Sequence, residues 1–562
     1  MSTTDIAPDT IPTGGATATA GAGVVGRREP GAVSVLGTWV TSSDSKVIGR
    51  QFIGVSVLAL LACAVLGVVL GVERIDGADT LIDADVLPEL FWALRIGLVY
   101  GVMVPLLLGV ALAVVPLQVG ARSLAFPRLA AAGFWAWLAG LVLVVIALAN
   151  NGGPGGGDAD MVDLFLAALG LLLCGLAAAA TSVAATVLTT RAPGMRMNRV
   201  PFFAWSALIA SIGLLLVLPV LLGVLVYLYV DTHYATDLLG GSAGVGSWIG
   251  FALTQPATYL FALPAVGVAA ELTPVTFGKR MPLRGVIYTG LAIVGVAALS
   301  AVTQQSIHDV PWAGSGLDLD DFGDKFLDLV PYALFMLLPI LGVVTVMFVG
   351  AVAARPPSDP ETWVKPRITA PFVFGFFGLG MAFVGMLAGA LVPIVDLGLQ
   401  GTVFEEGAFV YVAYGTVLGG LGAIAYWSPK WTGRTIPDKP ALGLATLGML
   451  ATVLASLPYL IAGFADQPAA SGTYDYDGPA ELWNVLVTVG HGLMAIVVLA
   501  FLGLWVKAGR TGEADAGADP WGGQTPEWLT TSPAPHDNFA EVPTVMSPEP
   551  LYDLNGEPGA TR

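Results

Sequence analysis

Histidine is the side chain best suited to bind transition metals and to move protons near neutral pH, and it is scarce in this sequence. The 562 residues include four histidines, His233, His308, His491 and His536. His233 and His308 lie at or near the ends of apolar runs, where we expect solvated side chains. His491 lies within an apolar run, and a lone histidine in such a run is more often a hydrogen-bonded core residue than a metal ligand.

Other chemically capable residues also lie in apolar surroundings. Cys63 and Cys174 both lie inside apolar runs, so they do not suggest a disulfide framework. Arg95 lies in such a run as well, and it either pairs with an acidic residue or, as we favour, extends its charged group to the membrane interface. Glu271 precedes Lys279 and is expected at the membrane interface. The sequence shows no phosphate-binding loop, metal-binding cysteine cluster or internal repeat.

The elements that must position these residues are predicted from composition. Hydrophobic residues make up 55% of the chain and charged residues 12%. Soluble domains carry about 25% charged residues, so half that share indicates an integral membrane protein. Apolar runs of about twenty residues recur along the chain, and such runs must be helices because lipid offers no partner for unpaired backbone groups. The predicted spans are 51–72, 92–118, 129–149, 162–189, 202–230, 246–272, 284–303, 328–354, 370–393, 408–428, 442–464 and 483–507.

The charged residues between these spans predict their orientation. Loops with lysine and arginine alternate with acidic loops, and only Arg74 and Lys325 clearly interrupt the pattern. Lysine and arginine accumulate on the cytoplasmic side of membrane proteins, so we expect both termini in the cytoplasm of a bacterial-type plasma membrane. The net charge of −17 then reflects outward loops and an acidic tail rather than a nucleic-acid-binding surface.

Three regions follow from this pattern. Residues 1–45 are rich in Ala, Gly, Thr and Pro and are predicted to be a disordered cytoplasmic tail without a cleavable signal peptide. Residues 46–508 form the twelve-span membrane domain. Residues 509–562 are rich in Pro, Gly and acidic residues and are predicted to be a cytoplasmic tail, either extended against protein or disordered.

Several motifs make the twelve-span pattern specific. The sequence resembles subunit I of the haem-copper oxidases, of the cytochrome c oxidase type, over roughly residues 45–555. The motifs that carry this resemblance occur in the family's order. They are Pro116–Ala121 with Ala125–Leu129, Arg191–Met195 with Pro201–Trp205, Trp427–Arg434, Asp519–Trp528 and Ser532–Phe539. The resemblance implies an all-α, twelve-helix transmembrane bundle, a place in the aerobic electron-transport chain, and partners that include the lipid bilayer and other oxidase-type subunits.

The same resemblance implies two haems and one copper held by six histidines, and all six are replaced here. Leu94 occupies the position of the haem ligand on the second span. Gln255, Gln304 and Gln305 occupy the three copper positions, and Ala408 and Val410 occupy the remaining two haem positions. Glutamine is a poor copper ligand, so we expect no haem, no copper and no catalytic residue.

Further working parts of the family are also missing. Ala257 replaces the proton-relay glutamate and Ser123 replaces the proton-entry aspartate. The family's propionate-binding arginines fall near 467–469, where the chain has Gln-Pro-Ala. Tyr259 is retained, but the histidine to which the family cross-links it is Gln255, so we expect a hydrogen-bonded core or interfacial tyrosine.

Three glutamines at converging positions allow two interpretations. Because an unpaired amide in hydrocarbon costs several kcal/mol, Gln255, Gln304 and Gln305 are expected to bond to one another and to water. Alternatively, they form a small polar pocket with a transport or sensing role. For the whole protein we favour a non-catalytic structural or regulatory paralogue in a respiratory membrane complex. An active, proton-pumping cytochrome c oxidase and a transporter or channel on the same scaffold remain alternatives, so enzymatic activity is left open.

Overall fold

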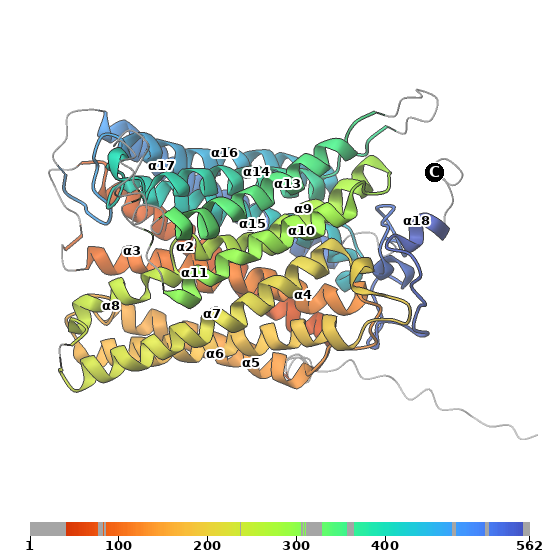
Figure 1. Cartoon of the computed structure of the whole chain (residues 1–562), viewed down its shortest axis with the longest axis horizontal. Coiled ribbons are helices and arrows are strands. Elements are labelled where there is room, and N and C mark those ends of the chain that lie inside the picture. The colour runs from red at the N-terminus through yellow and green to blue at the C-terminus, as the bar shows by residue number, and fades with distance from the viewer. Residues whose placement is uncertain are drawn as a thin grey trace, which may run out of the picture. The chain divides into compact units, whose positions relative to one another are not determined.

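The computed structural model describes residues 37, 41–76, 82–83, 86–236, 238–304, 307, 310, 329–356, 365–474, 479–511 and 516–554. Regular structure in these residues is helical, and two isolated β-bridges join Val310 to Ile394 and Thr402 to Pro468. Twelve helical segments of the described residues are long and apolar enough to cross a membrane. They run side by side in Figure 1. The prediction of an all-α, twelve-helix, multi-pass membrane bundle is confirmed.

Several spans consist of more than one helical element. The first six spans are α2 (Ser45–Glu73), α3–η1–α4 (Leu87–Ile96, Gly97–Met103, Val104–Gln118), α5 (Pro127–Leu148), α6 (Ala159–Thr189), α7 (Phe202–His233) and α8–η3–α9 (Gly241–Ile249, Gly250–Ala252, Ala257–Phe277). The other six are α10–η4–α11 (Arg284–Val294, Gly295–Ala297, Ala298–Thr303), the segment Leu329–Ala353 with η6 (Ala333–Leu337) and α13 (Leu338–Ala353), α14 (Ala370–Leu391), α15 (Val403–Thr432), α16 (Asp438–Gly463) and α17 (Ala480–Thr511).

Four spans depart from the single α-helices predicted for them, at η1, η3, η4 and η6. The predicted helix 246–272 is interrupted between Ala252 and Ala257, where Pro256 cannot donate a backbone hydrogen bond. The second span is π-helical over η1, just before Pro105. The first interruption bears on the site, because it places Gln255 in a non-helical turn that directly precedes α9.

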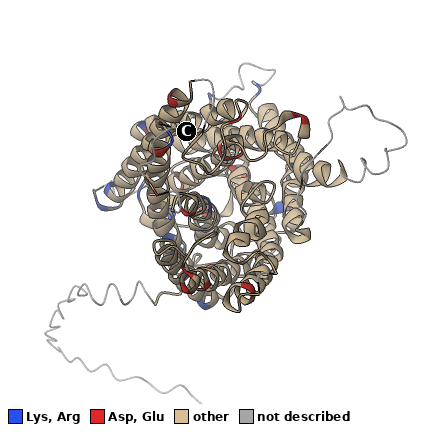
Figure 2. Cartoon of the chain, turned by 90° about the vertical axis from the view of Figure 1, so that its left-hand side faces the viewer, with Lys and Arg blue, Asp and Glu red and all other residues tan. Residues whose placement is uncertain are grey.

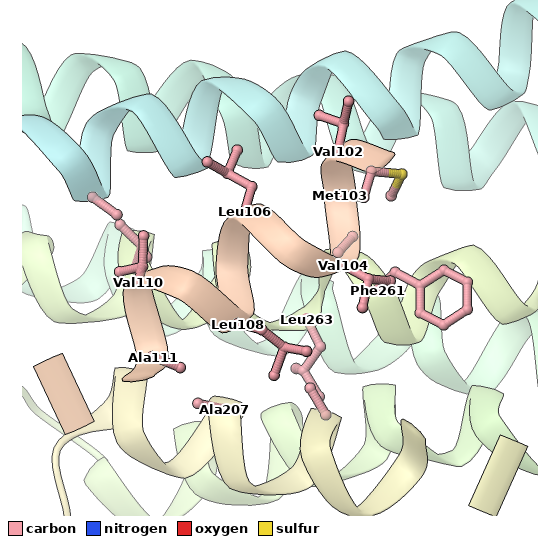
Figure 3. Close-up of a cluster of buried hydrophobic side chains, with 14 of the residues drawn as sticks. Val102, Met103, Val104, Leu106, Leu108, Val110, Ala111, Ala207, Phe261 and Leu263 are labelled. Atoms are coloured by element: carbon pink, nitrogen blue, oxygen red, sulfur yellow. The ribbon is translucent and has the colours of Figure 1, made fainter. Parts of the chain in front are cut away.

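The core of the bundle lies around α4, α9 and α15. Every residue of α4 is buried, and nearly all of α9 and α15 is buried as well. Figure 3 shows apolar side chains of η1 and α4 packed with Ala207 of α7 and with Phe261 and Leu263 of α9. Outer helices instead leave large apolar side chains exposed, such as Phe348 of α13 and Phe376 of α14. Exposed apolar side chains are expected where lipid is the solvent.

The two ends of the bundle differ in charge. We call the end that carries Arg122, Arg191, Lys279 and Lys430 the basic end, and the end that carries Glu405, Glu406 and Asp466 the acidic end. Figure 2 looks along the helices from the acidic end, and Lys, Arg, Asp and Glu colour only a minority of the ribbon. The tail segment 516–554, with η9 (Pro526–Leu529) and α18 (Pro550–Leu554), lies across the basic end (Figure 1).

Candidate functional site

Two of the positions that the resemblance assigns to haem ligands line the same small cavity. Leu94 of α3 and Val410 of α15 line a cavity of about 140 Å³ near the acidic end. His491 of α17 also lines it, and the Nδ1 atom of this buried histidine lies 2.7 Å from the Tyr414 hydroxyl oxygen. His491 is therefore a hydrogen-bonded core residue that lies against a cavity wall. Ligand pockets typically measure about 300–1,000 Å³, and this cavity is well below that range.

A second cavity, of about 310 Å³, adjoins the first. It is lined by Gln255, which stands at a copper-ligand position, and by Ala408, at a haem-ligand position. The other lining residues are Arg95, Thr254, Ile307, Met336, Gly389, Val392, Pro393, Gln400, Gly401, Glu405 and Phe409. Since Gln400 and Gly401 are exposed, the cavity borders the surface of the acidic end. A space of this size can hold several waters or one small molecule.

The amide of Gln255 is held by hydrogen bonds within the chain. Its Nε2 atom donates to the backbone oxygen of Gly385, at 3.2 Å, and its Oε1 atom accepts from the Tyr259 hydroxyl at 2.8 Å. The Tyr259 hydroxyl also lies 3.0 Å from the backbone oxygen of Met386. Gly389 leaves room for the amide, because a Cβ atom built there would lie 1.3 Å from Gln255 Oε1. Tyr259 is thus a buried, hydrogen-bonded tyrosine next to the turn before α9.

The expected network of three glutamines is wrong for Gln304. This residue is exposed at the end of α11 and lines a different cavity, of about 430 Å³, next to α7 and α8. Gln255 and Gln304 therefore face separate spaces, because α11 ends where Gln304 takes a left-handed backbone conformation with φ of 51°. Gln305 and His308 lie outside the described residues.

The acidic end holds a buried ion pair that the sequence reasoning missed. Arg74, fully buried beyond the end of α2, donates from NH1 to Glu406 Oε2 at 2.7 Å and from NH2 to Glu406 Oε1 at 2.9 Å. It also donates to the Tyr459 hydroxyl and to the backbone oxygen of Ser471. The Ala470 N–H donates to Glu406 Oε1 at 2.9 Å. Burial by itself lowers the pKa of the Arg74 guanidinium, but Glu406 and Tyr459 together more than offset this effect and the net direction is upward.

The position of Arg74 in the sequence carried a signal for this ion pair. Arg74 was one of two basic residues that interrupted the alternation of basic and acidic loops. A lone arginine in acidic surroundings predicts an ion pair, but its partner lies 332 residues away along the chain. The resemblance placed the family's propionate-binding arginines near residues 467–469. The ion pair lies next to this segment, because Ala470, which donates to Glu406, directly follows it. The chain's own carboxylate is bound there.

Arg95 lies between the two cavities and lines both of them. Its guanidinium carbon lies 5.4 Å from the centre of the Phe409 ring. Within the described residues it forms no hydrogen bond or ion pair, so the alternative of a direct ion pair is not realised there. The side chain is half-buried, and it contacts cavity space and an aromatic face.

The residues at the cofactor positions do not fit haem or copper. Leu94, Ala408 and Val410 offer no donor atom, and the Gln255 amide is already engaged by Gly385 and Tyr259. The described ranges contain no group of three or more His, Cys, Asp or Glu that could hold a metal. Haem and copper favour imidazole or thiolate donors, which these positions lack.

The basic end is closely packed by contrast. Glu527 of η9 is buried and accepts from Trp427 Nε1 at 3.0 Å and from Gln118 Nε2 at 3.2 Å. Lys430 Nζ donates to the backbone oxygens of Ala518 and Thr530, both at 2.8 Å. Gln118, Trp427, Lys430 and Glu527 belong to three of the motifs quoted above, so these motifs meet in one interface between the bundle and the tail.

Glu271 of α9 lies close to the contact between the bundle and the tail, and it is more buried than we expected. It was expected at the membrane interface, but it is only 4% exposed. Its Oε2 atom accepts from the backbone N–H of Phe203 at 3.3 Å. The start of α7 covers this end of α9, and this contact buries Glu271.

Known proteins match this chain along most of its length. The family model described as cytochrome c and quinol oxidase polypeptide I matches residues 47–493. A probable cytochrome c oxidase subunit 1-beta of Nocardia farcinica is 29% identical over 557 residues, covering 93% of this chain and 89% of the relative. A putative subunit 1-beta of Streptomyces avermitilis is 29% identical, with 96% and 95% covered. Cytochrome c oxidase subunit 1 of Corynebacterium glutamicum is 28% identical, with 92% and 88% covered.

Proposed function

Because this chain belongs to the cytochrome c and quinol oxidase polypeptide I family, we propose that it is a non-catalytic member of that family. In this proposal it binds neither haem nor copper and acts as a structural or regulatory partner in an aerobic respiratory membrane complex. One observation carries the proposal. The five described positions that would hold the family's metal ligands offer Leu94, Gln255, Gln304, Ala408 and Val410, and the sixth position is Gln305 in the sequence.

The Arg74–Glu406 pair supports the same proposal. A haem bound in the first cavity would need its propionates balanced by positive charge, and Arg74 is already bound to Glu406 through both terminal nitrogens. The resemblance implied that a haem propionate is bound in this region, whereas the carboxylate bound here is that of Glu406. Breaking such a buried pair is unfavourable, so this arrangement disfavours an added carboxylate at the same place.

A partner role rests on the part of the molecule that resembles the family most. The tail and the basic loops keep the motifs and pack tightly, which favours a preserved surface over a preserved reaction centre. The proposed partners are the lipid bilayer and other oxidase-type subunits, with no role for nucleic acid. Fold similarity alone does not transfer an activity whose residues are replaced.

An optical spectrum of the purified protein tests the proposal. The full chain is expressed in a haem-sufficient host and purified beside the Corynebacterium glutamicum relative as a positive control. We expect haem absorbance from the control preparation and none from this chain, together with co-purification of oxidase-type subunits from its native membrane. Absorbance equivalent to two haems per chain, or restored respiration in an oxidase-deficient strain, would identify an active oxidase and overturn the proposal.

The transporter alternative receives less support. It called for a polar route through Gln255 and Gln304, and these two residues line separate cavities. Within the described residues nearly every side chain of α4, α9 and α15, the helices at the core of the bundle, is buried.

We further propose a bacterial-type plasma membrane location with both termini in the cytoplasm. The basic end carries the lysines and arginines of five loops, as the positive-inside rule requires. Reporter fusions at residue 562 and in the Asn150–Asp158 loop test this orientation. A cytoplasmic signal at the first site and an external signal at the second are expected, and the reverse would contradict it.

A further inference from the structure

The two cavities at the former cofactor positions meet at Arg95. Three residues line both cavities, namely Arg95, Glu405 and Phe409. The Arg95 guanidinium lies beside the Phe409 ring, so it stands between a space of about 140 Å³ and one of about 310 Å³. A charged side chain within a membrane-spanning helix is unfavourable unless it is paired or hydrated, and it often marks a functional site.

The acidic residues near Arg95 are already engaged. Glu406 is bound by both terminal nitrogens of Arg74 and by the Ala470 N–H. Glu405 accepts from the backbone N–H of Gly401 at 3.0 Å, at the start of α15. Among the described residues, no acceptor within hydrogen-bonding distance meets the guanidinium donors of Arg95. Because Arg95 lines both cavities, an acceptor for its five N–H groups can come from a molecule in that space.

The larger cavity combines these donors with an apolar wall. Met336, Val392, Ala408 and Phe409 supply apolar surface. Gln255 donates an Nε2 hydrogen to Gly385 and is itself one of the polar residues that line the cavity. A mainly apolar cavity with a few polar groups is the usual form of a small-molecule site.

We propose that the cavity beside Arg95 is a binding site for a small organic carboxylate. The carboxylate binds the Arg95 guanidinium, and the apolar body of the ligand lies against Met336, Ala408 and Phe409. Planar guanidinium and carboxylate groups form two parallel hydrogen bonds, and the neighbouring Arg74–Glu406 pair shows this geometry within the same end of the bundle. A volume of about 310 Å³ suits a single-ring or short-chain acid rather than a two-chain lipid.

This inference goes beyond the proposed role, and it rests on the proposed absence of haem from this space. The two ideas fail in different ways. A haem spectrum would overturn the proposed function, whereas a haem-free protein that does not bind the carboxylate would overturn only the ligand site.

Glu405 gives the site an internal control. Its carboxylate also lines the cavity, so it repels an anionic ligand. A Glu405→Gln variant keeps an acceptor for the Gly401 N–H and removes the charge. It should therefore bind the carboxylate more tightly, by up to about fivefold, the effect of one charge at a few ångströms in a solvated site.

The test uses the full chain in a non-ionic detergent, with binding measured by titration calorimetry and by the shift in melting temperature. The probes are benzoate, its neutral analogue benzamide, and inorganic phosphate, which has charge but no apolar body. We expect saturable benzoate binding and no comparable binding of the other two. Arg95→Leu should weaken benzoate binding by about 10- to 100-fold, the loss expected for hydrogen bonds to a charged group. Arg95→Lys should retain part of it.

Controls separate loss of the site from loss of the fold. Arg128→Leu removes an exposed arginine at the opposite end and should leave benzoate binding unchanged. The Arg95 variants must elute and melt like the parent protein, and if Arg95→Leu does not, Arg95→Lys and Glu405→Gln carry the test. Equal binding of benzamide, equal binding of phosphate, or benzoate binding that is insensitive to these substitutions would overturn the proposal.

Discussion

The acidic and basic ends of this bundle differ in the surroundings of their buried polar groups. At the acidic end, Leu94 and Val410 line a cavity of about 140 Å³, and Gln255 lines one of about 310 Å³. Arg95 lines both cavities. At the basic end, Glu527 of the tail and Lys430 of the bundle are buried, and each has two hydrogen-bond partners. The acidic end contains cavities, and the basic end holds the family's motifs in buried hydrogen bonds.

This difference indicates which property of the family the chain retains. A reaction centre needs its donor atoms, and these are replaced at every position that the resemblance identifies. A docking end needs a defined surface, and here buried hydrogen bonds hold the tail in one arrangement. The comparison therefore favours a scaffold or regulatory role over catalysis.

The largest effect is expected from breaking the ion pair of the acidic end. Arg74→Leu should lower the free energy of unfolding by about 3 kcal/mol, because it leaves the Glu406 carboxylate largely buried and unpaired. Denaturant titration of the purified protein measures the loss. The double variant Arg74→Leu/Glu406→Leu should recover most of it. An equal loss in both variants would show that packing rather than charge explains the effect.

The next effect concerns the fit around Gln255. Gly389→Ala would place a Cβ atom at the Gln255 amide, so the side chain must shift and the Tyr259 hydrogen bond is lost. Overpacking of this kind costs about 1–3 kcal/mol. A double-mutant cycle with Gln255→Ala measures the coupling. Gly389→Ala should be nearly neutral in the Gln255→Ala background, and additive losses would contradict the proposed fit.

A smaller effect is expected where a single side chain of the basic end holds the tail. Lys430→Ala leaves the backbone oxygens of Ala518 and Thr530 without their donor, which should cost about 1–2 kcal/mol. Limited proteolysis of the tail measures its release. Lys439→Ala, an exposed lysine nine residues further along, serves as the matched control and should leave the tail protected.

The smallest effect is a pH dependence of tail docking. Burial raises the pKa of the Glu527 carboxyl, while the hydrogen bonds from Trp427 and Gln118 partly oppose this shift. A carboxyl whose pKa is higher in the folded state contributes stability below its unfolded pKa and loses it as pH rises through the folded pKa. The tail should therefore be cleaved faster at pH 8 than at pH 5.

A substitution at the same residue checks this pH dependence. Glu527→Gln should flatten the pH profile of cleavage, because the amide oxygen still accepts from Trp427 and carries no charge. The groups that act on Glu527 include Lys430, which attracts its carboxylate, and Glu271, which repels it. A profile unchanged by the substitution would assign the pH dependence to another group.

Much of the fold could be predicted because it depends on local composition. Twelve apolar runs, their helical state and the alternation of charged loops all follow from stretches of about twenty residues. Bounds and interruptions were less predictable. The break between Ala252 and Ala257 was missed, because an apolar run with an internal proline gives the same hydropathy whether the helix is kinked or broken there.

The candidate site was predicted only in part. Motif positions led to the prediction that the ligand residues are replaced, but they did not show that Gln255 and Gln304 face separate cavities. Side chains meet according to helix rotation and to where each helix ends, and α11 ends in a left-handed residue at Gln304 itself. The burial of Glu271 was not predicted for the same reason, because it depends on contact with α7.

The sequence by itself determined the twelve apolar helices of this protein and the family to which it belongs, because hydropathy and residue identity are properties of the chain. The tertiary structure alone decided what fills the vacated positions. The Arg74–Glu406 pair, the isolation of Gln304 and the place of Arg95 between two cavities all arise from contacts between residues far apart in the chain. Such contacts depend on how twelve helices pack against one another, which no local pattern specifies.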